Sequence, residues 1–130
     1  MILTLRTDNP QAEVSLYDQE NSRLEHYSWH ADRELSNTLH RQIYVLLQKQ
    51  SKNWSDISGI IFYSGPGSFT GLRIGASLAN VLASELDIPI VQTSGKDWIR
   101  LGQKELISTP KSRLVIPEYG REPHVTKPKK

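Results

Sequence analysis

Residues 59–75 of this 130-residue chain read GIIFYSGPGSFTGLRIG, and this stretch decides the fold. Residues 59–63 are an apolar run with β-branched and aromatic side chains, which predicts a buried and parallel strand. A glycine-rich loop follows, and apolar residues at helical spacing then predict a helix that ends near Leu86. A strand, a loop and a helix in this order are typical of an α/β sheet with helical crossovers.

The residues before this stretch predict the antiparallel half of the same sheet. Residues 2–5, 13–17 and 23–29 are strand-like, and the last two alternate polar and apolar side chains. Their short polar connections predict a meander. A helix with an N-cap at Asp32 is then expected to run to about Gln50, and it carries the apolar residues Leu35, Leu39, Ile43, Leu46 and Leu47.

The residues after the stretch predict one more strand and one more helix. Residues 90–92 form a short apolar run after the turn at Asp87–Pro89, and Ser94 is expected to cap a helix that passes through Trp98 and Leu106. The sequence therefore predicts an α/β fold with a mixed five-stranded sheet and the element order βββαβαβα.

A domain over residues 1–109 is followed by a proline-rich, basic segment over residues 110–130. Residues 111–130 hold 6 basic and 2 acidic side chains, whereas residues 1–110 hold 10 and 12. Within the segment, residues 114–116 can form at most a short strand. A basic tail contacts RNA or an acidic partner, or is simply solvated.

Composition excludes several classes of site. The chain has no Cys, so disulfides, thiolate nucleophiles and cysteine-ligated zinc are excluded. No apolar run approaches the ~18 residues of a membrane span, and the first residues do not form a signal peptide. We expect a cytoplasmic protein. His26 and His30 lie on a strand-like stretch, His40 on a helix and His124 in the tail, so no metal site is expected.

The glycine-rich loop is the strongest local signal. Gly65, Gly67 and Gly71 permit a tight backbone path, and Ser68 or Thr70 can cap the following helix, whose dipole favours an anion. The loop has no Gly-Lys pair and its G-x-G-x-x-x-G spacing is not a dinucleotide fingerprint. A phosphate site and a purely structural turn therefore both stay open.

The helix after the loop carries two kinds of apolar flank. Bulky residues form one flank (Ile74, Leu78, Val81, Leu82), and small residues form the other (Gly75, Ala76, Ala79, Ala83). The bulky flank is expected to serve the core and the small flank to meet a partner helix, although a helix enclosed within its own domain would show the same pattern. Arg73 opposes the helix dipole, which suggests an anionic ligand or a partner carboxylate, and an arginine that extends over the surface stays equally open.

The string from Gly65 to Gly75 resembles the signature of the TsaB (YeaZ) family, which serves the synthesis of threonylcarbamoyladenosine in tRNA. The likeness extends from residue 1 to about residue 107 and includes residues 54–57 and 87–90, and residues 116–123 look like the family's C-terminal segment. The resemblance implies an actin-like (ASKHA, ribonuclease H-like) lobe. It also implies a non-catalytic subunit without a cofactor, which binds and activates TsaD in threonylcarbamoyl transfer to tRNA, with the ATPase TsaE in the larger complex.

The resemblance implies that two helices of the lobe pack against TsaD, and the partner-binding residues expected on these helices are Leu35, Leu39, Ile43, Arg73, Gly75, Ala76, Ala79 and Ala83. The signature loop is Gly65, Pro66, Gly67, Ser68, Phe69, Thr70 and Gly71. The chain departs from the family in two ways: its second lobe is expected to be absent, and Arg6 stands where an acid is usual. A homodimer of the isolated chain is left open. The alternatives are a small nucleotide-binding protein or enzyme of the glycoprotease label, and an RNA-binding module with a basic tail.

Overall fold

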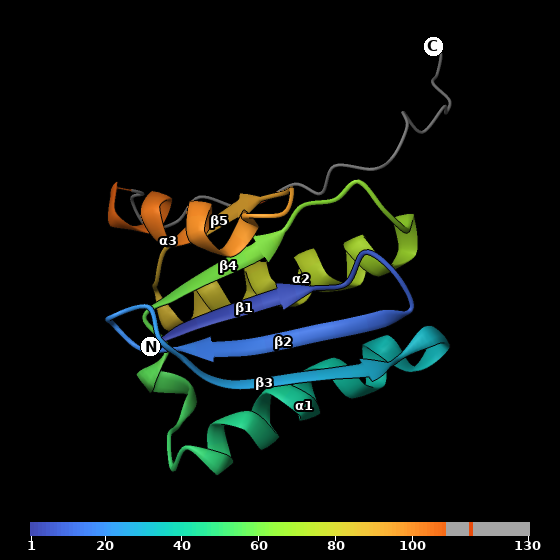
Figure 1. Cartoon of the computed structure of the whole chain (residues 1–130). Helices are drawn as coiled ribbons and strands as arrows, with labels where there is room; N and C mark the ends of the chain where they lie inside the picture. The colour runs from blue at the N-terminus through green and yellow to red at the C-terminus, as the bar shows by residue number, and fades with distance from the viewer. Residues whose placement is uncertain (109–114, 116–130) are drawn as a thin grey trace.

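The computed structural model describes residues 1–108 and residue 115 (Figure 1). Its helices and strands follow the predicted order. They are β1 (Ile2–Arg6), β2 (Gln11–Tyr17), β3 (Arg23–His30), η1 (Asp32–Glu34), α1 (Leu35–Lys49), η2 (Trp54–Asp56), β4 (Gly59–Tyr63), α2 (Phe69–Leu86), β5 (Ile90–Thr93) and α3 (Trp98–Ser108).

The sheet has five strands in the order β3-β2-β1-β4-β5. β1 is the central strand: it runs antiparallel to β2, with Ile2 opposite Tyr17, and parallel to β4, with Ile2 opposite Gly59. β4 and β5 are also parallel. The predicted mixed sheet, its antiparallel meander and its buried parallel strand are therefore confirmed.

Helices cover both faces of the sheet. α1 and α2 lie on one face, where Leu3, Leu5 and Phe62 share a large core cluster with the apolar residues of the two helices. α3 covers the opposite face over β4 and β5, where Tyr63 packs edge-on against Trp98 at 5.4 Å between ring centroids. Figure 1 shows α2 running behind β1 and β4, with α3 beside β5.

Two predicted helix starts are wrong. α1 begins at Leu35 and not after a cap at Asp32, because a 3-10 turn over Asp32–Glu34 comes first. α3 begins at Trp98, since Gly95 has a φ of 88°, a left-handed conformation that a right-handed helix does not contain. Within residues 1–108 and 115, no helix combines the length and the hydropathy that crossing a membrane requires.

Candidate functional site

The glycine-rich loop lies against the turn that follows β1. The Ser68 N–H donates to the Asp8 carbonyl oxygen at 2.7 Å, and the Thr7 hydroxyl donates to the Gly71 carbonyl oxygen at 2.8 Å. A Cβ atom at Gly71 would overlap the Thr7 carbonyl oxygen, and one at Gly67 would lie 2.5 Å from the Asp8 Cβ atom. The two glycines are therefore required by this close approach of two backbones.

The start of α2 already uses backbone donors that an anion would need. Ser68 is the N-cap, as expected, and its hydroxyl oxygen accepts from the Gly71 N–H at 3.2 Å. The Ser68 N–H is bonded to Asp8. These hydrogen bonds favour the interpretation of the loop as a structural turn that joins β4, α2 and the turn after β1.

Arg6 lies at the end of β1 and forms an ion pair. Its Nε and Nη2 atoms donate to the two carboxylate oxygens of Asp8 at 2.8 and 3.3 Å, and its guanidinium lies 4.0 Å from the centre of the Tyr63 ring. Burial lowers the pKa of Arg6, but the hydrogen bond and charge of Asp8 outweigh burial and raise the pKa above its ordinary value. The guanidinium of Arg6 at the end of β1 is therefore already paired with a carboxylate of the same chain.

Two of the described histidines, His26 and His40, contact side chains that are not typical metal ligands. His26 shares a hydrogen bond of 2.7 Å with the Ser15 hydroxyl, and His40 stacks on Trp54 at 4.8 Å. Among residues 1–108 and 115, no three His, Cys, Asp or Glu side chains gather closely enough to hold a metal ion. His124 lies outside the described residues.

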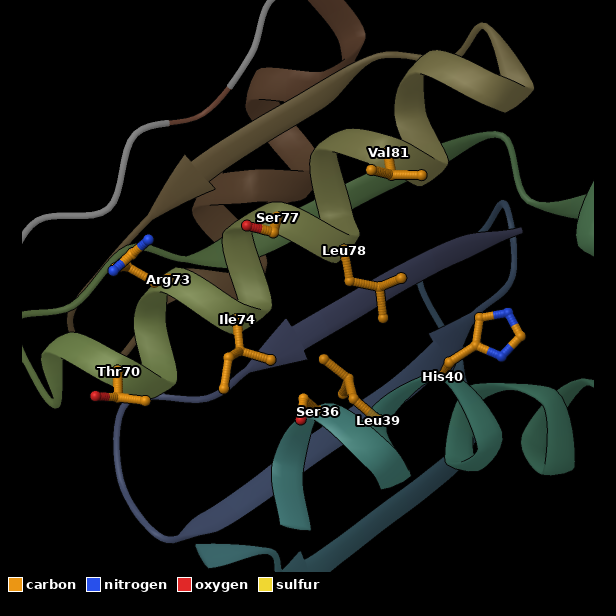
Figure 2. A pocket seen from close by; sticks show the side chains of 9 residues that line it. All are labelled: Ser36, Leu39, His40, Thr70, Arg73, Ile74, Ser77, Leu78 and Val81. Atoms are coloured by element: carbon orange, nitrogen blue, oxygen red, sulfur yellow. The ribbon is translucent and has the colours of Figure 1, made fainter. Parts of the chain in front are cut away.

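A groove of about 460 Å³ opens between α1 and α2 (Figure 2). Leu39 of α1 and Ile74 and Leu78 of α2 point toward one another across it, while His40 and Arg73 lie toward its two ends. The residues that line it are Ser36, Leu39, His40, Thr70, Arg73, Ile74, Ser77, Leu78 and Val81. Its lining is thus mainly apolar, with a basic residue at one end.

The expected orientation of α2 is wrong. The small residues Gly75, Ala76, Ala79 and Ala83 are all buried in the chain's own core, and Ala79 is 0% exposed. Of the bulky residues, Ile74, Leu78 and Val81 line the groove, whereas Leu82 is buried in the core as expected. The reason is the close approach of α2 to the sheet, where a Cβ atom at Gly75 would overlap the Thr7 hydroxyl and lie 3.0 Å from the Phe62 ring.

The partner-binding residues predicted on α1 are also mostly core residues. Leu35, Leu39 and Ile43 are buried in the chain's own core, and of these only Leu39 also lines the groove. Sequence reasoning missed Tyr44, which is 47% exposed on the same side of α1 as His40. Its place four residues after His40 is the signal that could have identified it.

The remaining signature-loop residues lie around the start of α2. Phe69 is 47% exposed, and the Arg73 guanidinium lies 5.4 Å from the centre of its ring. Thr70 lines the groove, whereas Pro66 is exposed and Gly65 is buried with a φ of 102°. The structure therefore brings Thr70, Arg73 and Leu39 to one groove and places Gly67, Ser68 and Gly71 against the turn after β1.

The TsaD family model, described as tRNA N6-adenosine threonylcarbamoyltransferase, matches residues 29–105. A protein of Bacillus subtilis (strain 168) named tRNA threonylcarbamoyladenosine biosynthesis protein TsaB is 34% identical over 98 residues, which are 75% of this chain and 42% of that protein. A Chromobacterium violaceum protein named tRNA N6-adenosine threonylcarbamoyltransferase is 31% identical over 106 residues, covering 70% of this chain and 31% of that protein.

The structure of YeaZ from Pseudomonas aeruginosa is similar over 72% of this chain and 43% of its own, with a TM-score of 0.66 and 29% identity. The expected actin-like α/β lobe is confirmed by this similarity. The chain spans less than half the length of each of these relatives, since the covered shares are 42%, 31% and 43%.

Proposed function

The chain belongs to the TsaB (YeaZ) family, and from this premise we propose that it is a non-catalytic subunit in the synthesis of threonylcarbamoyladenosine in tRNA. In this proposal it binds and activates a TsaD-type threonylcarbamoyltransferase in the cytoplasm. A TsaE-type ATPase and tRNA join through the larger complex, as the family resemblance implies.

The open groove between α1 and α2 is the observation that carries the proposal. Val81 at its rim is 56% exposed, and Tyr44 on the neighbouring helix is 47% exposed. Leu78 and Ile74 continue the same apolar surface inward. An exposed apolar surface of this kind, between two helices and bordered by polar residues, is typical of a protein–protein contact. A pair of amphipathic helices from a homologous subunit fits it.

The positive charge of Arg73 at one end of the groove favours a partner that has a carboxylate at this position. Arg73 lies in the first turns of α2, where a cation opposes the helix dipole. Within residues 1–108 and 115, no carboxylate pairs with Arg73. An acidic side chain of a partner helix at this position would pair with Arg73 and compensate for the unfavourable dipole.

Two contacts support a role without catalysis of its own. The Ser68 and Gly71 N–H groups have acceptors inside the chain, which leaves less of the loop to hold a phosphate. Asp8 is paired with Arg6 and is therefore not a free carboxylate for a metal or a proton transfer.

The test is copurification with a TsaD-type subunit and reconstitution of threonylcarbamoyl transfer to tRNA. Val81→Arg places a charge in the groove and should weaken binding about a hundredfold or more, because an unpaired buried charge costs about 3–5 kcal/mol. Ser84→Arg is the matched control, since Ser84 is an exposed residue of the same helix that does not line the groove. Equal binding by both variants would refute the groove as the contact. Steady-state ATP turnover by the isolated chain, abolished by a loop substitution, would refute the non-catalytic role.

A further inference from the structure

Asn80 of α2 binds the main chain of a residue far along the sequence. Its Nδ2 atom donates to the Val115 carbonyl oxygen at 3.1 Å, and its Oδ1 atom accepts from the Val115 N–H at 2.9 Å. The two residues are 35 positions apart. A side-chain amide offers one donor side and one acceptor side, which is the pair that a neighbouring strand would offer to an extended residue. Asn80 therefore recognises main chain and not a particular side chain.

The side chain of Val115 is buried as well. It is 6% exposed and belongs to the same core cluster as Ala76, Ala83 and Ile90. Ala76 and Ala83 lie four residues before and three residues after Asn80, so the three residues share one side of α2. Small side chains on this side leave room for an apolar side chain next to the amide.

This side of α2 is distinct from the groove. The groove is lined by Ile74, Leu78 and Val81, and neither Asn80 nor Val115 takes part in it. The two surfaces of α2 thus differ. The groove between the helices is open, whereas the other surface is covered by Val115.

We propose that the side of α2 formed by Ala76, Asn80 and Ala83 is a docking site for the main chain and side chain of one apolar residue of a peptide segment, and that the chain's own Val115 is its resident ligand. The site binds this residue through two hydrogen bonds between the Asn80 side-chain amide and the main chain, and through one small apolar contact. It goes beyond the proposed function, because it requires neither TsaD nor the groove.

Hydrogen exchange in the whole chain tests the amide's role. The Val115 N–H should exchange slowly in the unmodified protein, and Asn80→Ala should speed its exchange about tenfold or more because both hydrogen bonds are lost. Asn80→Asp keeps the acceptor and loses the donor, so it should give an intermediate rate. Ser84→Ala on the next turn is the control and should leave the rate unchanged. Equal rates in the unmodified protein and Asn80→Ala would overturn the proposal.

A labelled peptide with the sequence of residues 110–120 tests whether the site accepts a segment in trans. Val115→Asp should displace the resident residue, because a carboxylate is not stable in the apolar contact. The peptide should then bind this variant more tightly than the unmodified chain, and adding Asn80→Ala should abolish binding. Equal binding with and without Asn80, or failure of the peptide to bind a folded Val115→Asp chain, would show that no docking site exists there. Circular dichroism checks the fold of each variant.

Discussion

Two arginine substitutions on opposite sides of α2, only two residues apart, should have very different effects on stability. Ala79 faces the sheet and is 0% exposed, whereas Val81 lies at the rim of the groove and is 56% exposed. Ala79→Arg should therefore unfold the isolated chain or nearly so. Val81→Arg should leave it folded, since the new side chain can extend into water.

The magnitude follows from these two surroundings. An arginine at position 79 overfills a packed core, at a cost of about 1–3 kcal/mol, and leaves an unpaired buried charge, at about 3–5 kcal/mol. The sum of about 4–8 kcal/mol is comparable to the whole stability of a small domain, about 5–15 kcal/mol. At position 81 the free energy of unfolding should change by no more than about 0.5 kcal/mol, as at most surface sites.

Urea unfolding followed by circular dichroism measures both effects on the same protein preparation. We expect Ala79→Arg to be unfolded without urea or to have a much lower midpoint, and Val81→Arg to keep the midpoint of the unmodified chain. A folded Ala79→Arg chain with an unchanged midpoint would refute the assignment of the small residues to the core. An unfolded Val81→Arg chain would refute the assignment of Val81 to an open surface.

Three further outcomes are expected. Gly71→Ala should lower the free energy of unfolding by about 1–3 kcal/mol in urea, although Ala favours helices, because its Cβ atom would overlap the Thr7 carbonyl oxygen. Asp8→Ala should lower it by about 1 kcal/mol at low salt and by less at 1 M salt, since it leaves the half-buried Arg6 without its carboxylate. Removal of residues 117–130 should change the melting temperature by less than about 4 °C, because the prolines and basic side chains of this segment argue against a large buried contribution, and a larger fall in a thermal scan would contradict this.

The central part of the fold was predictable because its signals are local. Residues 59–63 are apolar, and all five are buried in β4. The capping hydroxyl of Ser68 and the end of α2 at Leu86 also follow from neighbouring residues. Helix starts were less predictable, since the 3-10 turn before α1 and the left-handed Gly95 depend on backbone geometry that no side-chain pattern encodes.

The faces of α2 were not predictable from its hydrophobicity alone. A helical wheel separates small from bulky residues, but it does not say which group approaches the sheet. Close packing of Gly75 on Thr7 and Phe62 decides this, and these residues come from α2, the turn after β1 and β4. One signal in the sequence does point outward: Val81 lies beside the polar residues Ser77 and Ser84 on the wheel.

The contact between Asn80 and Val115 had no signal in the sequence. Two elements, β5 and α3, lie between them in the sequence, and the contact exists only because the folded chain returns to α2. A polar residue on a helix normally indicates a solvated face, so Asn80 gave no reason to expect a main-chain contact.

The central place of β1 has a consequence for the order in which the protein folds on the ribosome. β1 can pair with β2 as soon as the meander has been synthesised, but its other edge stays unpaired until β4 follows, because Ile2 and Leu3 pair with Gly59 and Ile60. During that interval Leu3 and Leu5, both 0% exposed in the finished sheet, lack the cover of α2, which packs on β1 and follows β4 in the chain. The nascent meander is thus an aggregation-prone intermediate, with an unpaired strand edge and exposed apolar side chains. Its lifetime depends on the rate of translation through residues 31–63.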